Sequence, residues 1–195
     1  MSHDHNSPSQ VRTGIFAASF SELRSTKTIA FCGVMAALAV VLGFVARIQI
    51  GNYIRIGFSE LPNILVDTMF GPVTGGIFGG ALDILKFIAK PTGSYFPGFT
   101  LSAILGGLIY GVFLYGKKVT IPRVLAANVL VKGLVNICLN SFWLYLLYNR
   151  GVLGMMPARI TTNLIMIPVD TAIYYFMLKG VQKAGVTNLV RPARA

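Results

Sequence analysis

Charged side chains are scarce in this sequence. Only 12% of its 195 residues are charged, whereas a soluble domain carries about 25%, and 54% of the residues are hydrophobic. Residues 28–46 and 91–116 contain no charged side chain, and a helix needs about 20 apolar residues to cross a bilayer. These deficits exclude an ordinary soluble domain and predict a membrane protein.

Catalytic and metal-binding motifs are also missing. Cys32 and Cys138 lie in apolar spans without metal-type spacing, so we interpret them as small hydrophobic residues. Residues 111–118 come close to a P-loop, but Lys118 stands where the pattern needs a serine or threonine, and no strand precedes the segment. We therefore expect no enzyme activity, no metal and no cofactor, and any ATP coupling has to come from a partner.

Acidic residues are few, with 6 Asp and Glu against 17 Lys and Arg, which gives a net charge of +11. The basic residues cluster at predicted helix ends, a pattern typical of positive-inside topology rather than of nucleic-acid binding. It favours cytoplasmic N- and C-termini. Residues 1–26 lack the apolar core of a signal peptide, so we expect a disordered cytoplasmic tail there.

The apolar segments predict an all-α integral membrane protein with six transmembrane helices. They form one domain, residues 27–180, between tails at 1–26 and 181–195. Gly71-Pro72 is expected to break the chain after a second helix too short to span alone. Alternating isoleucines around Gly51-Asn52 predict a small hairpin. The helices are expected near residues 27–45, 59–70, 71–89, 99–115, 124–148 and 155–178.

Small residues recur every four positions in two of these helices. Gly71, Gly75 and Gly79 form a ladder, and the first helix carries the pairs Gly33–Ala37 and Ala39–Gly43. Small residues at this spacing lie on one face and allow another helix to approach closely. For the first helix, two interpretations stay open: packing inside the molecule, or a surface on which a partner docks.

Polar residues recur at three- and four-residue steps in four helices, which places each set on one helix face. Charges inside apolar spans are costly and usually face a cavity or a partner. For Asp67 and Asp170 we expect pairing with a neighbouring helix; for Asp83, Lys86, Arg159 and Asn163 we expect ligand contact. The four sets are Glu60, Asn63, Asp67; Asp83, Lys86, Lys90; Asn128, Lys132, Asn136, Asn140; and Arg159, Asn163, Asp170.

With both termini inside, the loops at residues 47–58 and 91–98 and most of these polar residues fall on the extracellular side, whereas Asp67 and Asp170 lie deeper and Lys132 lies in mid-membrane. We therefore expect an extracellular-side binding pocket capped by the loops. Aromatic rings, cations, acids and amides together suit a planar heterocycle with an anionic tail. The candidate binding residues are Asp83, Lys86, Arg159, Asn163, Arg47, Glu60, Tyr95, Phe96, Asn140 and Trp143.

Two runs carry a resemblance to a known family: GPVTGGIFGGALDILKFI at residues 71–88 and GSYFPGFTLSAILGGLIYG at residues 93–111. Together they resemble the substrate-binding S component of energy-coupling factor (ECF) vitamin transporters, and the second run is similar to the folate-specific type. The resemblance covers about residues 25–180. It implies a high-affinity vitamin binder in a prokaryotic plasma membrane, without an ATPase of its own. It also implies partnership with a transmembrane coupling subunit and two cytoplasmic ATPases, and delivery by tilting of the whole S component.

The resemblance also implies residue roles. The docking motif of the family's first helix matches Gly33 and Ala37, with Ala36 in a neighbouring register. On folate, Asp83 or Glu60 would meet the pterin edge. The carboxylates or carbonyls would contact Arg159, Lys86 and Arg47; Tyr95, Phe96 and Trp143 would stack; Asn140 and Asn163 would orient the ligand.

Three alternatives stay open. An S component for another heterocyclic vitamin, such as riboflavin or thiamine, fits the same pocket chemistry. An intramembrane lipid-head-group transferase would use Asp67, Asp83 and Asp170 around a metal. A stand-alone ion-coupled carrier would be expected to show internal repeats, which the sequence lacks.

Overall fold

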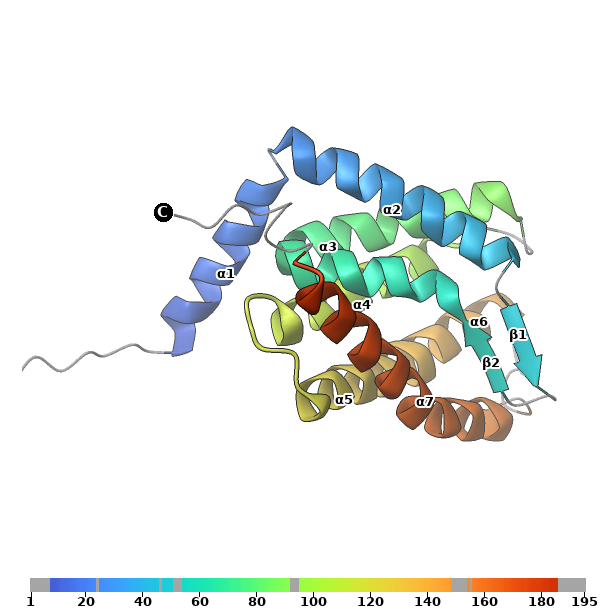
Figure 1. Cartoon of the computed structure of the whole chain (residues 1–195). Helices are drawn as coiled ribbons and strands as arrows, with labels where there is room; N and C mark the ends of the chain where they lie inside the picture. Colours follow the sequence, from blue (N-terminus) through green and yellow to red (C-terminus); the bar gives the residue numbers. More distant parts are fainter. Residues whose placement is uncertain are drawn as a thin grey trace, which may run out of the picture.

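The computed structural model describes residues 8–23, 25–45, 47–50, 54–91, 95–148, 154 and 156–185 of the chain. These residues form a bundle of helices with one small β-hairpin (Figure 1). A 3₁₀ turn, η1 (Phe58–Glu60), leads into α3, and a π-helical segment, η2 (Val131–Leu139), joins α5 to α6. The helices are α1 (Pro8–Glu22), α2 (Thr26–Val45), α3 (Leu61–Ala89), α4 (Pro97–Leu114), α5 (Ile121–Leu130), α6 (Asn140–Tyr148) and α7 (Met156–Lys183).

The hairpin consists of β1 (Arg47–Ile50) and β2 (Ile54–Gly57), which pair antiparallel with Arg47 opposite Gly57 and Ile50 opposite Ile54. The hairpin predicted from the isoleucine alternation is therefore confirmed. It lies at one end of the bundle, and α1 and the end of α7 lie at the other (Figure 1). The hairpin thus marks the end of the bundle remote from α1 and from the end of α7.

The chain reverses direction within α3. Gly71 has φ +88°, a left-handed conformation that favours glycine, so the predicted break at Gly71-Pro72 is confirmed. The segments on either side run antiparallel, because Lys86 Nζ lies 2.8 Å from Glu60 Oε1 and Gly75 lies against the Asp67 side chain. We call them the first arm (residues 61–70) and the second arm (residues 72–89).

Five helical stretches of the described residues are long and apolar enough to cross a membrane. One of them, Phe58–Ala89, contains both arms, which are two of the six helices predicted from the sequence. Apolar side chains such as Val34, Ile88 and Phe176 are 64–72% exposed, as expected where helices face lipid. The five stretches are Thr26–Val45, Phe58–Ala89, Pro97–Leu114, Ile121–Leu147 and Met156–Lys183.

The second arm packs against α4 through glycines. A Cβ atom on Gly107 would lie 2.5 Å from the carbonyl oxygen of Gly75, and one on Gly79 would lie 2.9 Å from that of Ala103. Gly111 lies against the backbone of Pro72 in the same way. The glycine ladder therefore serves close backbone contact between α3 and α4, as its spacing predicted.

The first described residues differ from the expected disordered tail, because residues 8–22 form α1. Its Ser19 is fully buried against the reversal in α3. Ser19 Oγ donates to the carbonyl of Phe70 at 2.7 Å and accepts from the backbone N–H groups of Val73 and Thr74 at 3.0 and 3.1 Å. These two N–H groups begin the second arm and have no partner within it, so Ser19 caps that arm from a separate helix.

The small residues of α2 divide between two faces. Ala39 is fully buried, and Gly43 lies near Ser59, so the Ala39–Gly43 pair packs inside the molecule. Gly33 and Ala37 are exposed, whereas Ala36 is half-buried against the core. Only the Gly33–Ala37 pair therefore offers an outward surface.

Adjacent glycines in α4 give a matched test of this packing. Gly107→Ala places its Cβ against the backbone of Gly75, so we expect a loss of about 1–3 kcal/mol of stability and a lower melting temperature in detergent. Gly106→Ala is the control, because its nearest neighbour would be Val131 Cγ1 at 3.9 Å. Equal melting temperatures for the two variants would contradict the close-contact interpretation.

Candidate functional site

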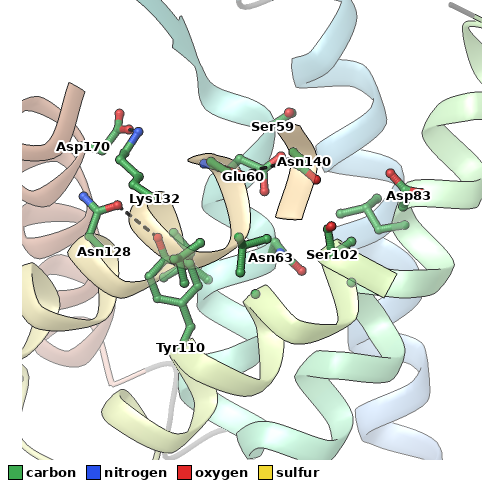
Figure 2. Close-up of a pocket in the computed structure, with 18 of the residues that line it drawn as sticks. Ser59, Glu60, Asn63, Asp83, Ser102, Tyr110, Asn128, Lys132, Asn140 and Asp170 are labelled. Atoms are coloured by element: carbon green, nitrogen blue, oxygen red, sulfur yellow. Dashed lines mark hydrogen bonds and ion pairs between the residues drawn. The ribbon is translucent and has the colours of Figure 1, made fainter. Parts of the chain in front are cut away.

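A cavity of about 560 Å³ lies inside the bundle, beside the end that carries the β-hairpin. Its volume falls within the roughly 300–1,000 Å³ of sites that enclose small molecules. In Figure 2, Asp170, Lys132 and Asn128 lie on one side, Asp83 and Ser102 on the other, and Glu60 and Asn63 between them. The remaining lining residues are Ser59, Ile64, Gly79, Leu82, Lys86, Phe99, Ala103, Gly106, Tyr110, Val131, Val135, Asn136, Asn140 and Tyr174.

Four of the ten predicted binding residues line this cavity: Asp83, Lys86, Glu60 and Asn140. The reversal in α3 brings Glu60 back beside Lys86. The packing of α4 places η2 and α6 on the side of the cavity opposite α3. Arg47 begins β1, but its side chain lies outside the described residues. The other five predicted residues lie behind the cavity wall or at its rim.

Asp83 is held at the rim by a short chain of hydroxyl groups. Thr100 Oγ1 donates to Asp83 Oδ2 at 2.8 Å, and the Tyr95 hydroxyl lies 2.8 Å from the same Thr100 oxygen. Among the described residues no cation pairs with Asp83. Tyr95 is 43% exposed and does not reach the wall, so its position differs from the predicted stacking role.

Glu60 and Lys86 neutralise each other's charge at the mouth of the cavity. Their ion pair of 2.8 Å joins the start of the first arm to the end of the second. Both side chains are partly exposed, 50% for Glu60 and 29% for Lys86. An ammonium has three donors, so Lys86 keeps the capacity to bind a further acceptor.

The aromatic residues form a cluster of edge-to-face and tilted rings that extends back from the cavity wall. The ring of Phe99 lines the cavity, Phe96 lies 6.1 Å from it, and Trp143 lies 5.6 Å from Phe96. Trp143 Nε1 also donates to Ser102 Oγ at 3.1 Å, and Ser102 lines the cavity. Phe96 and Trp143 were predicted to contact ligand, but the structure places them where they support Phe99 and Ser102.

An ion pair closes the opposite side of the cavity. Lys132 Nζ lies 2.6 Å from Asp170 Oδ2, and both side chains are largely buried, at 11 and 12% exposure. The predicted interhelical pairing of Asp170 is therefore confirmed. For Asp67 it is wrong: this carboxylate is fully buried against Gly75, which carries no donor side chain, and neither oxygen has a described hydrogen-bond partner.

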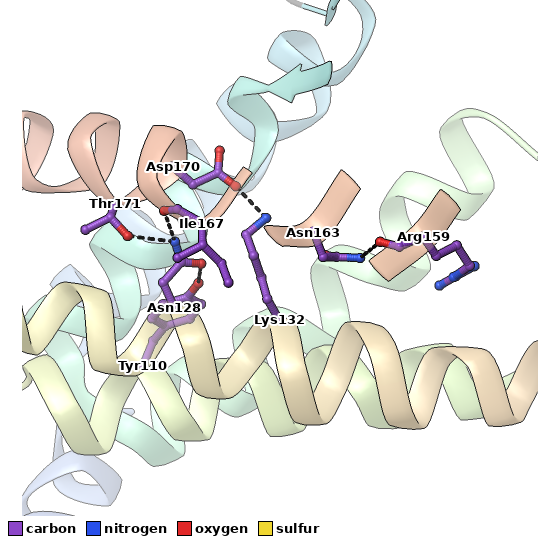
Figure 3. A network of polar contacts seen from close by, with 8 residues as sticks. All are labelled: Tyr110, Asn128, Lys132, Arg159, Asn163, Ile167, Asp170 and Thr171. Atoms are coloured by element: carbon purple, nitrogen blue, oxygen red, sulfur yellow. Dashed lines mark hydrogen bonds and ion pairs between the residues drawn. The ribbon is translucent and has the colours of Figure 1, made fainter. Parts of the chain in front are cut away.

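A hydrogen-bonded network anchors this side to α7 (Figure 3). The Tyr110 hydroxyl donates to Asn128 Oδ1 at 3.2 Å, and Asn128 Nδ2 donates to the carbonyl of Ile167 and to Thr171 Oγ1 at 3.1 and 3.0 Å. Asn128 is fully buried, and both ends of its amide are satisfied. It therefore joins α4, α5 and α7, and both of its N–H donors are used within the protein.

Arg159 and Asn163 lie on α7 beyond the cavity wall. Arg159 Nη2 donates to the backbone carbonyl of Asn136 at 3.2 Å, and Asn163 Nδ2 donates to the carbonyl of Arg159 at 2.9 Å. No described carboxylate pairs with Arg159, and its Nε is buried without a partner. Arg159 thus does not line the cavity itself, because Asn136 lies between Arg159 and the cavity.

Two buried acceptors in the wall lack partners: Asn63 Oδ1 and Asn140 Oδ1. Buried polar atoms are nearly always hydrogen-bonded, and each exception needs an explanation. Both atoms have almost no accessible surface, so a ligand N–H donor would reach them only after a local shift of the side chains. Asn63 was not among the ten predicted residues, although its i, i+3 spacing from Glu60 is a signal that could have found it.

The π-helical geometry of η2 aligns further polar residues with the cavity. In an α-helix, residues four apart rotate by about 40° at each step, which would turn a long four-residue stripe away from one face. The wider turn of a π-helix reduces this rotation, and such segments occur often at functional sites. Lys132, Asn136 and Asn140 therefore all line the cavity.

No group of three or more His, Cys, Asp or Glu side chains in the described part of the chain is arranged to hold a metal ion. The cavity instead offers carboxylates, ammonium groups, amides and hydroxyls around the rings of Phe99, Tyr110 and Tyr174. This chemistry is suited to a polar aromatic molecule held by hydrogen bonds and charge.

Comparison with known proteins places this architecture among transporters. Residues 27–178 match the family described as ECF transporter, substrate-specific component. The chain is 42% identical over 137 residues to the folate transporter FolT of Clostridium novyi, covering 70% of this chain and 80% of that one. It is 30% identical over 162 residues to FolT of Leuconostoc mesenteroides, covering 80% and 86%. A crystal structure of FolT bound with folic acid matches 78% of this chain and 91% of its own, with 35% identity and a TM-score of 0.69.

The buried ion pair gives a test of what holds the cavity together. Lys132→Met or Asp170→Leu leaves one uncompensated charge, so we expect each to cost about 3–5 kcal/mol, whereas the double variant should recover most of that loss. Thermal unfolding in detergent without ligand measures all four proteins. A double variant as unstable as the sum of the single changes would contradict a direct pair.

Proposed function

This chain belongs to the substrate-specific components of ECF transporters, and from that membership we propose that its cavity binds folate for uptake into the cell. As a member of this family it is a multi-pass protein of a prokaryotic plasma membrane and serves transport rather than catalysis. The observation that carries the choice of folate is the similarity to FolT, including a FolT structure that holds folic acid. The end of the bundle with the β-hairpin would face outward.

The pterin ring of folate carries an exocyclic amine and a ring N–H side by side, which suits a carboxylate. Asp83 is our choice for this edge, because it lines the cavity without an ion-pair partner and Thr100 orients one of its oxygens. Glu60 is the alternative, but its charge is already matched by Lys86. Charge-assisted hydrogen bonds of this kind are about twice as strong as neutral ones.

The glutamate end of folate carries two carboxylates and would lie toward the mouth. Lys86, with donors to spare, is placed to bind one of them, and Arg47 and Arg159 are further candidates from β1 and α7. Arg159 would reach the ligand only by exchanging its contact with the carbonyl of Asn136. Its unpartnered buried Nε is consistent with such an exchange.

Ring and amide contacts would complete the site. Phe99 would stack on the ligand, with Phe96 and Trp143 holding its position from behind, and Tyr95 would act through Thr100. The unpartnered oxygens of Asn63 and Asn140 would accept from ligand N–H groups. Asn163 would act indirectly, by holding the backbone at Arg159.

Delivery would require partners. We propose a transmembrane coupling subunit and two cytoplasmic ATPases, with tilting of the whole S component carrying the loaded cavity inward. The exposed Gly33–Ala37 face of α2 is the candidate docking surface, and Ala36, half-buried, lies at its edge. Small residues there would allow close approach of a partner helix.

The single tryptophan gives a direct assay. Because Trp143 contacts Ser102 in the cavity wall, we expect folic acid to quench its fluorescence saturably in purified, detergent-solubilised protein. Riboflavin and thiamine should produce no saturable quenching. Light absorbed by the ligand also lowers fluorescence. Calorimetry on Trp143→Phe controls for this, because it detects folic acid binding without a fluorescence signal. Saturable binding of riboflavin or thiamine without folic acid would reject folate and leave the family assignment intact.

Substitution of the rim carboxylates identifies which of them contacts the pterin edge. Asp83→Asn removes a charged acceptor, so we expect about 10- to 100-fold weaker folic acid binding by calorimetry. Glu60→Gln should weaken binding less, because the carboxylate is occupied by Lys86. A larger loss in Glu60→Gln than in Asp83→Asn would transfer the role to Glu60.

A further inference from the structure

A second, smaller cavity of about 50 Å³ opens beside the main one. Ser59 and Lys86 line both cavities, so the small one continues from the mouth of the large one. It runs between α2 and the end of the second arm of α3, away from Asp83. Its remaining walls are Val40, Gly43, Phe44, Ala89 and Lys90.

Most charged residues that line the two cavities are paired with an opposite charge. Lys132 is matched by Asp170, and Lys86 by Glu60. Among the described residues, this leaves one unmatched acid in the main cavity, Asp83, and one unmatched cation in the small cavity, Lys90. A ligand that meets both must carry hydrogen-bond donors at one end and negative charge at the other.

We propose that the small cavity is a subsite for an extended anionic tail, namely the second and later glutamates of a folate polyglutamate. The proposal rests on folate as the ligand of the main cavity. Each added γ-linked glutamate brings one more carboxylate, which would continue past Lys86 to the Lys90 ammonium. The apolar side chains of Val40 and Phe44 would pack against the methylene groups of the added residue.

The expected gain is modest, because Lys90 is exposed and salt screens surface ion pairs. We expect about two- to fivefold tighter binding of pteroyl-diglutamate than of folic acid, which carries one glutamate. The gain should shrink as salt concentration rises. Lys90 also follows the last residue of a helix, where a cation complements the helix dipole, so the test must separate ligand contact from helix stability.

The test compares the affinities of folic acid, pteroyl-diglutamate and pteroyl-triglutamate by calorimetry on the full chain in detergent. The decisive quantity is the ratio of mono- to diglutamate dissociation constants, which should fall to about one in Lys90→Gln. Lys117→Gln is the matched control, because Lys117 is also exposed but lies beyond the end of α4 and donates to the carbonyl of Val112. There the ratio should stay at its original value.

Two results would overturn the subsite while leaving folate binding intact. One is equal affinity of the original chain for folic acid and pteroyl-diglutamate. The other is a diglutamate preference that Lys90→Gln leaves unchanged. Absence of any folic acid binding would overturn the proposed function and the subsite together, so the monoglutamate measurement distinguishes the two failures.

Discussion

The close backbone contact between α3 and α4 is the constraint on which the rest of this structure depends. Within a bilayer, apolar side chains gain little by leaving lipid, so helices associate through tight packing. Gly75 and Gly79 supply that packing by letting α4 approach to within backbone contact. Because α3 is folded back on itself, this contact fixes both of its arms and therefore the position of every acid and cation they carry.

Charge compensation then decides which polar groups remain for a ligand. Lys132 pairs with Asp170, and Asn128 is hydrogen-bonded to α4 and α7. The side of the cavity formed by these residues therefore holds the helices together. The unpartnered oxygens of Asn63 and Asn140 lie elsewhere in the wall. A cavity that is rigid on one side and unsatisfied on the other is suited to binding, since part of the cost of ordering it has been met by folding.

Much of this arrangement could be predicted from residue spacing. The apolar spans, the break at Gly71, the isoleucine hairpin and the pairing of Asp170 all follow from local patterns and were confirmed. The membership of α1 in the fold could not be predicted, because its contacts are with distant residues: the hydrogen-bond partners of Ser19 are more than 50 positions away. The π-helical turn of η2 has no spacing signal either, since its sequence also fits an α-helix.

The sequence by itself determined the membrane setting and the faces on which polar residues lie, because these depend on composition and on helical periodicity. The family resemblance came from two particular runs, residues 71–88 and 93–111. Tertiary structure decided which of those residues share a wall. Trp143 and Phe96 have the chemistry of a stacking site but support Phe99 from behind, and Asp67 is the same residue type as Asp83 but is enclosed against Gly75. Spacing along a helix gives a direction around its axis, whereas contact with a ligand depends on distances between helices, which only their packing sets.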